Sequence, residues 1–145
     1  MSVDDNVFKD VCDLLHNNRI NFWICHGTLL GIIRENRLLP WDHDIDFAVW
    51  DHETDKSHIV DIMLSHGYQQ EVITGEMDCL HFLGEEKKVD ISFYKIKDNI
   101  ASIKWAISPK DTFGKLMLFV SNNISKNNDE ILINHSIPKK AMLTI

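Results

Sequence analysis

The segment WDHDIDF, residues 41–47, places Asp42, Asp44 and Asp46 at intervals of two within a largely apolar stretch. Side chains two residues apart on a β-strand lie on the same face, so this spacing predicts one strand face with three carboxylates. Two carboxylates about 5 Å apart repel each other by roughly 3 kcal/mol at an effective dielectric of about 20. A divalent cation among them reverses the sign of that interaction. The segment therefore predicts a cation site on a rigid strand.

Ligands that are all oxygen atoms suit Mg²⁺ or Mn²⁺. The alternative is a solvated acidic edge strand, which would protect the sheet from aggregation. The apolar residues that flank the three aspartates favour the metal site, since an edge strand that serves only as a guard is usually less embedded.

A further aspartate, Asp90 in KKVDISFY (residues 87–94), alternates with apolar residues in the manner of a strand. If that strand lies beside the first, Asp90 faces the same cations. Two neighbouring carboxylates and a distant third form the ligand set of two-metal phosphoryl or nucleotidyl transfer. The row of Asp42, Asp44 and Asp46, together with Asp90, therefore supplies the candidate metal ligands and catalytic carboxylates.

The segment HGTLLG, residues 26–31, lies between an expected strand and an expected helix. Glycine lets backbone N–H groups approach a phosphate, and a helix N-terminus favours an anion. Gly27, Thr28 and Arg34 are therefore candidate donor-binding residues, with Thr28 supplying a hydroxyl and Arg34 a planar guanidinium. The alternative is a simple strand-to-helix turn with Arg34 on the surface.

The bulk properties of the chain exclude several classes of protein. Its 145 residues predict a single domain, residues 1–145, and its net charge of −7 argues against a nucleic-acid binder. Three scattered cysteines indicate a reducing compartment and no structural zinc. No signal peptide is visible and no apolar run approaches the length of a transmembrane helix, so we expect a cytoplasmic protein.

The hydrophobic periodicity predicts helices alternating with strands and therefore a mixed α/β domain. The first helix is expected to be capped by Ser2 or Asp4 and to end at Asn17–Asn18. The expected later helices are about 28–36 and 54–65. The expected strands are 21–27, 37–50, 68–73, 78–83, 88–96, 99–108 and 130–134, with a hairpin turn at 84–88. For Trp41, Trp50 and Trp105, core packing is favoured over stacking on a ligand.

The run HGTLLGIIRENRLLPWDHDID, residues 26–46, resembles the signature of the LicD/fukutin-related family, in which GTLLG is followed by an arginine and then by PWD-x-DID. This family belongs to the nucleotidyltransferase-fold superfamily. The close likeness spans residues 22–50, and Asp90 and IPKKAML (residues 137–143) extend it. The resemblance implies an α/β (α+β) fold, with a mixed sheet and helices packed on its outer side.

The resemblance also implies a function. It predicts magnesium-dependent transfer of a phospho-linked group, such as phosphocholine or a polyol phosphate, from a CDP-activated alcohol to a hydroxyl of a glycan or lipid-linked sugar. In this sequence Asp44 and Asp46 match the metal-binding pair, and Asp90 the third carboxylate. Gly27 and Thr28 match the phosphate-binding turn, Arg34 the arginine, and Asp42 takes a supporting role.

Two alternatives stay open. One is a minimal nucleotidyltransferase that moves NMP from a nucleoside triphosphate donor onto a small molecule or a protein. The other is a catalytically inactive binding module of the same fold, against which the intact aspartate set argues. Many family members are considerably longer than this chain, so its acceptor site is expected to be minimal, to come from a partner, or to have been lost by truncation or decay.

Overall fold

The computed structural model describes residues 3–73, 78–107, 124–127 and 130–138, with side chains described up to residue 104. Within these residues the elements follow in the order α1 (Asn6–Asn17), β1 (Phe22–Ile24), α2 (His26–Glu35), β2 (Asp44–Trp50), α3 (Lys56–Ser65), β3 (Gln69–Glu71), β4 (Cys79–Leu83), β5 (Lys88–Lys97), β6 (Ile100–Ile107), β7 (Ile124–Asn127) and β8 (Glu130–Pro138).

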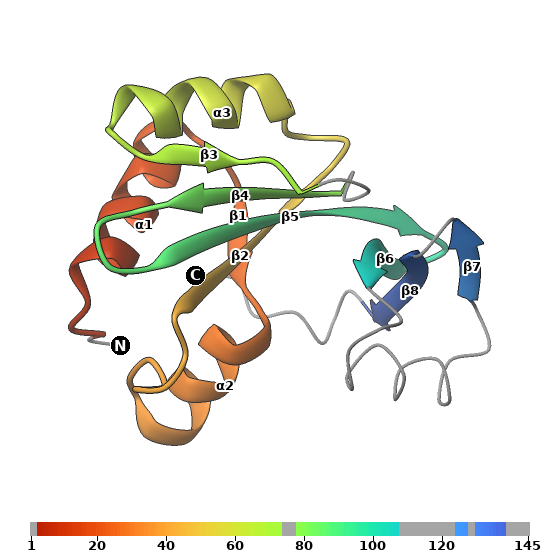
Figure 1. The fold of residues 1–145 in the computed structure, drawn as a ribbon, viewed down its shortest axis with the longest axis horizontal. Helices are drawn as coiled ribbons and strands as arrows, with labels where there is room; N and C mark the ends of the chain where they lie inside the picture. Colours follow the sequence, from red (N-terminus) through yellow and green to blue (C-terminus); the bar gives the residue numbers. More distant parts are fainter. Residues whose placement is uncertain (1–2, 74–77, 108–123, 128–129, 139–145) are drawn as a thin grey trace.

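The sheet is mixed, and β5 is its central strand. Neighbouring strands follow the order β1-β2-β5-β6-β8-β7, while β4 pairs with both β3 and β5. β2 and β5 run parallel, and the other pairs described are antiparallel. Figure 1 shows β5 running the length of the molecule, with α1 and α3 near β3 and β4 and with α2 at the bottom of the view. This architecture confirms the predicted mixed α/β sheet with helices packed outside it.

The two faces of the sheet have different hydrophobic clusters. On one face, α1 and α3 pack against alternate residues of β2 and β5, among them Phe47 and Ile91, which are fully buried. On the other face, a smaller cluster contains Trp23, Trp50 and Tyr94. Because side chains alternate along a strand, this second face is also the one that carries Asp46.

Side-chain capping explains where α1 and α3 begin. Asp5 precedes α1, and its carboxylate accepts a hydrogen bond of 2.9 Å from the N–H of Phe8. Asp55 caps α3 in the same way, through the N–H of Ser57. An aspartate at this position satisfies a helix N–H that has no partner within the helix. The predicted caps of the first helix, Ser2 and Asp4, are therefore wrong.

Two predicted boundaries were displaced around the aspartate segment. The strand expected over residues 37–50 begins only at Asp44, because the N–H of Asp42 bonds to the carbonyl of Leu39 at 3.0 Å and closes a turn. The strand expected over 21–27 ends at Ile24. The hairpin predicted between β4 and β5 is confirmed, with the N–H of Gly84 donating to the carbonyl of Lys87 at 2.9 Å.

Candidate functional site

Asp46 and Asp90 lie side by side across two neighbouring strands. They are register partners in the parallel pairing of β2 with β5, so their side chains leave the same face of the sheet. Asp44, at the start of β2, is exposed, whereas Asp46 is partly buried. The structure therefore brings together three of the carboxylates that the sequence singles out.

Asp42 joins this group from a different position than the sequence predicts. It precedes β2 and is not on the strand face, because the chain turns at Leu39–Asp42 before the strand begins. Its Oδ1 accepts a hydrogen bond of 3.3 Å from the N–H of Asp44. The charge of Asp42 also raises the pKa values of both Asp44 and Asp46. Asp42 therefore belongs with Asp44, Asp46 and Asp90 to one acidic group, although it does not lie on the strand.

The electrostatics of the group agree with its crowding. Burial, followed by the charges of Asp90, Asp42 and Asp44, raises the pKa of Asp46 to about 7, while a hydrogen bond involving Thr28 lowers it. Burial, followed by the charges of Asp90 and Asp42, also raises the pKa of Asp44. Like charges in a desolvated place disfavour the ionised form, so a cation among these carboxylates would relieve a real strain.

The first turn of α2 packs directly on the acidic group. Thr28 is buried, and its Oγ1 accepts a hydrogen bond of 2.8 Å from the N–H of Asp46. A Cβ atom at Gly27 would collide with the carboxylate of Asp42 and lie 3.9 Å from Oδ2 of Asp46. The residue before it, His26, has a φ of 49°, a strained value for a residue other than glycine. The absence of a Cβ at Gly27 therefore leaves room for the carboxylate of Asp42 where the backbone approaches the acids.

Arg34 lies at the far end of the same helix. It is exposed in the last turn of α2, seven residues beyond Gly27, which corresponds to about 10 Å along a helix axis. The structure places Gly27, Thr28, Asp42, Asp44, Asp46 and Asp90 together but does not bring the backbone of Arg34 to them. A donor-binding role for Arg34 stays a prediction.

The sequence interpretation missed His81, which contacts Asp90. Its Nδ1 lies 2.8 Å from Oδ1 of Asp90, and the two residues are register partners in the antiparallel pairing of β4 with β5. The structure pairs Leu83 with Lys88, and this register sets His81 opposite Asp90. The sequence alone did not give this register, because the predicted turn included residue 88.

Two thiols lie close to the carboxylates. Burial, with the charge of Asp46 as the next cause, raises the pKa of Cys25 well above its ordinary value. Burial also raises the pKa of Cys79, while a hydrogen bond with His81 acts in the opposite direction. Together with Cys12, which is also unpaired, these residues agree with the expectation of reduced cysteines.

The fit of a divalent cation can be judged from these side chains. Their donor atoms are carboxylate oxygens, the ligands that Mg²⁺ and Mn²⁺ prefer. No group of three or more His, Cys, Asp or Glu side chains in the described part of the chain is already arranged to hold a metal ion. Mg²⁺ in transfer enzymes commonly takes one or two carboxylates, with substrate phosphates and water as its other ligands. The residues fit such a shared site rather than a closed protein cage.

The tryptophans differ in their surroundings. Trp50 is buried and its ring lies 4.5 Å from that of Trp23, centroid to centroid, as expected for a core residue. Trp41, by contrast, is 67% exposed next to the acidic segment, so the core packing predicted for it is wrong. The side chain of Trp105 and most of residues 137–143 lie outside the described residues.

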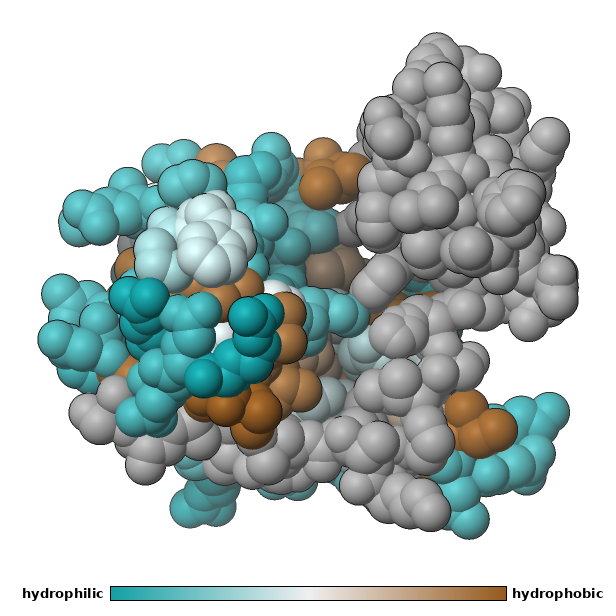
Figure 2. Space-filling view, turned by 90° about the horizontal axis from the view of Figure 1, so that it is seen from below, coloured by the Kyte–Doolittle hydropathy of each residue, from teal (hydrophilic) through white to brown (hydrophobic). Residues whose placement is uncertain are grey.

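The surface around α2 mixes apolar and charged groups. Figure 2 views the molecule from below, the side on which α2 lies in Figure 1, and shows hydrophobic patches close to strongly hydrophilic ones. The exposed apolar side chains of this region are Leu30, Ile33 and Trp41. This surface thus offers apolar and charged side chains side by side, near the acidic group.

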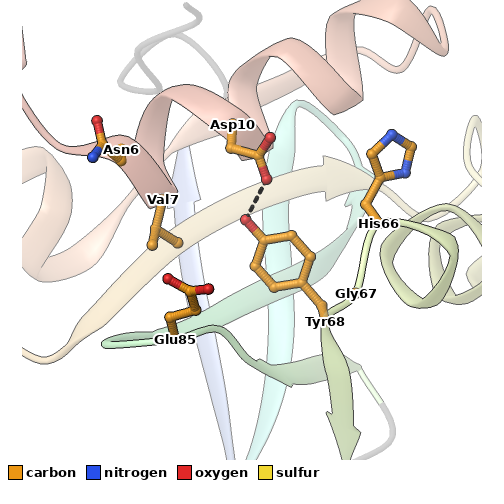
Figure 3. Close-up of a pocket in the computed structure, with 7 residues that line it drawn as sticks. All are labelled: Asn6, Val7, Asp10, His66, Gly67, Tyr68 and Glu85. Atoms are coloured by element: carbon orange, nitrogen blue, oxygen red, sulfur yellow. Dashed lines mark hydrogen bonds between the residues drawn. The ribbon is translucent and has the colours of Figure 1, made fainter.

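A separate pocket of about 470 Å³ lies apart from the acidic group. It is lined by Asn6, Val7, Asp10, His66, Gly67, Tyr68 and Glu85. Figure 3 shows the hydroxyl of Tyr68 bonded to Asp10 of α1, a distance of 2.6 Å. None of the aspartates of the acidic group lines this pocket, so it does not define the candidate site.

Comparison with known proteins places the chain in a family. Residues 19–140 match the family model described as LicD/FKTN/FKRP, nucleotidyltransferase domain. The match covers far more than half of the chain. The chain therefore belongs to the LicD/FKTN/FKRP family, as its sequence signature predicts.

Curated relatives are longer proteins. The uncharacterised protein RT0683 of Rickettsia typhi is 30% identical over 126 residues, which cover 86% of this chain and 40% of that protein. The uncharacterised protein RP689 of Rickettsia prowazekii is 40% identical over 57 residues, covering 39% of this chain and 21% of that protein. The chain thus spans well under half the length of both relatives.

A solved structure shares the fold. The lincosamide antibiotic adenylyltransferase LnuA, with lincomycin bound, superposes with a TM-score of 0.50 and 18% identity, covering 77% of this chain and 67% of LnuA. At this identity the likeness shows the nucleotidyltransferase fold alone. Within the described residues, no helix is long and apolar enough to cross a membrane.

Proposed function

We propose that this member of the LicD/FKTN/FKRP family transfers a phospho-linked group from a CDP-activated alcohol to a hydroxyl of a glycan or lipid-linked sugar, with Mg²⁺ or Mn²⁺ as cofactor. Phosphocholine and polyol phosphates are the groups that the family signature favours. The observation that carries the proposal is the register pairing of Asp46 with Asp90, beside Asp44 and under the first turn of α2.

In this proposal Asp44, Asp46 and Asp90 would hold the cation. When bound, it would polarise the phosphate oxygens of the donor and stabilise charge on the leaving CMP. The raised pKa of Asp46 supports this assignment, because the charge of a cation would favour the ionised form of a carboxylate that is otherwise hard to ionise.

The protein's own groups would orient the donor. The first turn of α2 presents backbone N–H groups beside the acids at Gly27, where the absence of a Cβ leaves room for close approach. A helix N-terminus favours an anionic group, so this turn would bind a phosphate of the donor. The hydroxyl of Thr28 already holds the strand of Asp46 in place.

The acceptor hydroxyl must lose a proton during the transfer. Asp90 could accept that proton, although a carboxylate that serves as a metal ligand is a poor base. Asp42 accepts a hydrogen bond from the N–H of Asp44 and adds negative charge to the site. We therefore give it a supporting role.

The decisive experiment measures the products formed from different donors. The purified protein is incubated with Mg²⁺ and either CDP-choline or a CDP-polyol, together with a panel of sugar acceptors, and released CMP is measured. Asp44→Asn should abolish CMP release, while Asp61→Asn, an exposed position on α3, should leave it unchanged. Failure of every CDP-alcohol to release CMP in the parent protein would contradict the proposal.

An alternative is transfer of NMP from an NTP to a small molecule or protein. The description of the matched family domain as a nucleotidyltransferase favours it, and the same carboxylates would serve. Here the α-phosphorus of an NTP is attacked, so the released product is pyrophosphate. Pyrophosphate release that depends on Asp44, without CMP release from CDP-alcohols, would select this alternative.

A catalytically inactive binding module is the remaining alternative. It predicts that neither product appears and that the Asp44→Asn variant binds nucleotides and Mn²⁺ as the parent protein does. The clustering of four carboxylates with raised pKa values at two of them argues against it, since a site without a cation would gain stability by losing some of them.

A further inference from the structure

Three side chains form a row across the middle of the sheet. Asp46 on β2 pairs in register with Asp90 on β5, and Asp90 pairs in register with His81 on β4. Register partners project from the same sheet face. The carboxylate of Asp90 is therefore flanked by an acid on one side and by an imidazole on the other.

The contact between His81 and Asp90 is short and sheltered. Nδ1 of His81 lies 2.8 Å from Oδ1 of Asp90, and the two side chains are 11% and 22% exposed. An ionised carboxylate only accepts hydrogen bonds, so when Asp90 is ionised this contact requires the tautomer of His81 that carries a hydrogen on Nδ1. One oxygen of Asp90 is thus engaged by His81, while its second oxygen takes no part in that bond.

The surroundings of Asp90 explain why it needs such a partner. Asp90 is the leading charged neighbour that raises the pKa of both Asp44 and Asp46, so these acids repel it. A side chain on a strand can turn away from such repulsion by rotating about its side-chain bonds. The imidazole on the β4 side opposes that rotation with a fixed, charge-assisted donor.

We propose that His81 is a positioning residue for the transfer reaction, holding the carboxylate of Asp90 in the orientation in which its second oxygen serves the cation shared with Asp44 and Asp46. This inference rests on the proposed function. Removing a group that orients a metal ligand through a hydrogen bond typically lowers metal affinity by about 10–100-fold. Loss of the Nδ1 donor should therefore weaken cation binding by that amount.

The test uses a matched pair of amide variants and an apolar one. The amide nitrogen of asparagine is separated from Cα by the same number of bonds as Nδ1 of histidine, whereas that of glutamine corresponds to Nε2. His81→Asn should therefore keep Mn²⁺ affinity within about threefold of the parent, while His81→Gln and His81→Leu should lose about 10–100-fold. Affinity is measured by calorimetric titration of Mn²⁺ in the presence of a CDP-alcohol, and thermal melting confirms that each variant is folded.

The outcomes separate this inference from the proposed function. If the parent binds Mn²⁺ and releases CMP, but all three variants bind Mn²⁺ equally well, the positioning role is wrong. Equal loss in His81→Asn and His81→Leu would indicate a packing role and would also overturn it. If the parent neither binds Mn²⁺ nor reacts with any nucleotide donor, the proposed function fails, and this inference with it.

A measurement on the metal-free protein gives an independent check. Long-range ¹⁵N–¹H NMR spectra of the imidazole should show a hydrogen on Nδ1 of His81, and the Asp90→Asn variant should change the chemical shift of that nitrogen. A spectrum with hydrogen on Nε2 alone would show that Nδ1 does not donate to Asp90, and would overturn the inference without any activity assay.

Discussion

The backbone N–H of Asp46 donates a hydrogen bond to Oγ1 of Thr28 across 2.8 Å, which fastens the first turn of α2 to the strand of the acidic group. Replacing Thr28 by valine keeps the side-chain shape but removes this acceptor. The variant should lose about 1–3 kcal/mol of unfolding free energy, because a partly buried N–H is left without its partner. Urea denaturation measures this loss.

Thr28→Ser is the matched control, since it keeps the hydroxyl and removes only a methyl group. It should retain more stability than Thr28→Val. Equal stability of the Val variant and the parent protein would show that the bond contributes nothing to the fold.

Gly31 should be less tolerant of alanine than Gly27, although both are in α2. A Cβ at Gly31 would lie 2.7 Å from the carbonyl oxygen of Arg37 and 3.0 Å from Cγ of Leu39. A backbone carbonyl cannot move aside cheaply, so Gly31→Ala should cost about 1–3 kcal/mol despite the higher helix propensity of alanine. Thermal or urea denaturation would detect this cost.

Gly27→Ala provides the comparison. Its Cβ would meet the end of the Asp42 side chain, which can rotate away, so the fold should lose less stability than in Gly31→Ala. A reversal of this order would contradict the packing described for α2.

The metal-free protein should become less stable as the pH rises from about 4 to about 7. The pKa of Asp46 is raised from 3.8 to about 7 by burial and its acidic neighbours, so over this interval the native state holds a proton that the unfolded chain has released. Stability therefore falls with rising pH in this window and levels off above it. Urea denaturation in the presence of EDTA at a series of pH values measures the slope.

Asp46→Asn should remove the contribution of Asp46 to the dependence of the unfolding free energy on pH. The variant should therefore be more stable than the parent at pH 8 without metal. It should also abolish the transfer reaction. Addition of Mg²⁺ should stabilise the parent protein at pH 8 more than the variant. A variant that is less stable than the parent under metal-free conditions would show that Asp46 is not under electrostatic strain.

Asp78 should contribute to stability from outside the acidic group. Its side chain is only 5% exposed, lies 3.3 Å from Nζ of Lys95, and accepts a hydrogen bond of 3.2 Å from the N–H of Lys104. Asp78→Ala should lose about 1–3 kcal/mol of unfolding free energy because it leaves that backbone donor without its acceptor. The exposed Asp61→Ala is a suitable control, and equal denaturation midpoints for the two variants would contradict the role of Asp78.

Part of the central geometry of the site follows from the sequence pattern. Alternation predicted one strand face with Asp42, Asp44 and Asp46 and a second strand with Asp90, and β2 and β5 do pair with Asp46 opposite Asp90. The sequence alone did not show that these two strands are neighbours. It was insufficient for Asp42, because a regular spacing of two does not show where a strand begins. The hydrogen bond that closes the Leu39–Asp42 turn decides that boundary.

Other differences have similarly local causes. His26 and Gly27 were expected at the end of a strand but form the start of α2, since the short β1 is held by its pairing with β2 rather than by its own propensity. His81 was overlooked because a single histidine in an apolar strand carries no functional signal. Its meaning comes only from the hairpin register that sets it against Asp90.

The surroundings of the two thiols near the aspartates, Cys25 and Cys79, lower their reactivity toward oxidants. Peroxide and alkylating agents attack the thiolate form of cysteine, and both burial and the charge of Asp46 keep Cys25 protonated. Burial first, and the charge of Asp46 second, therefore keep the Cys25 thiol in its less reactive protonated form. A cysteine can therefore occupy this buried position beside the candidate site and resist oxidation.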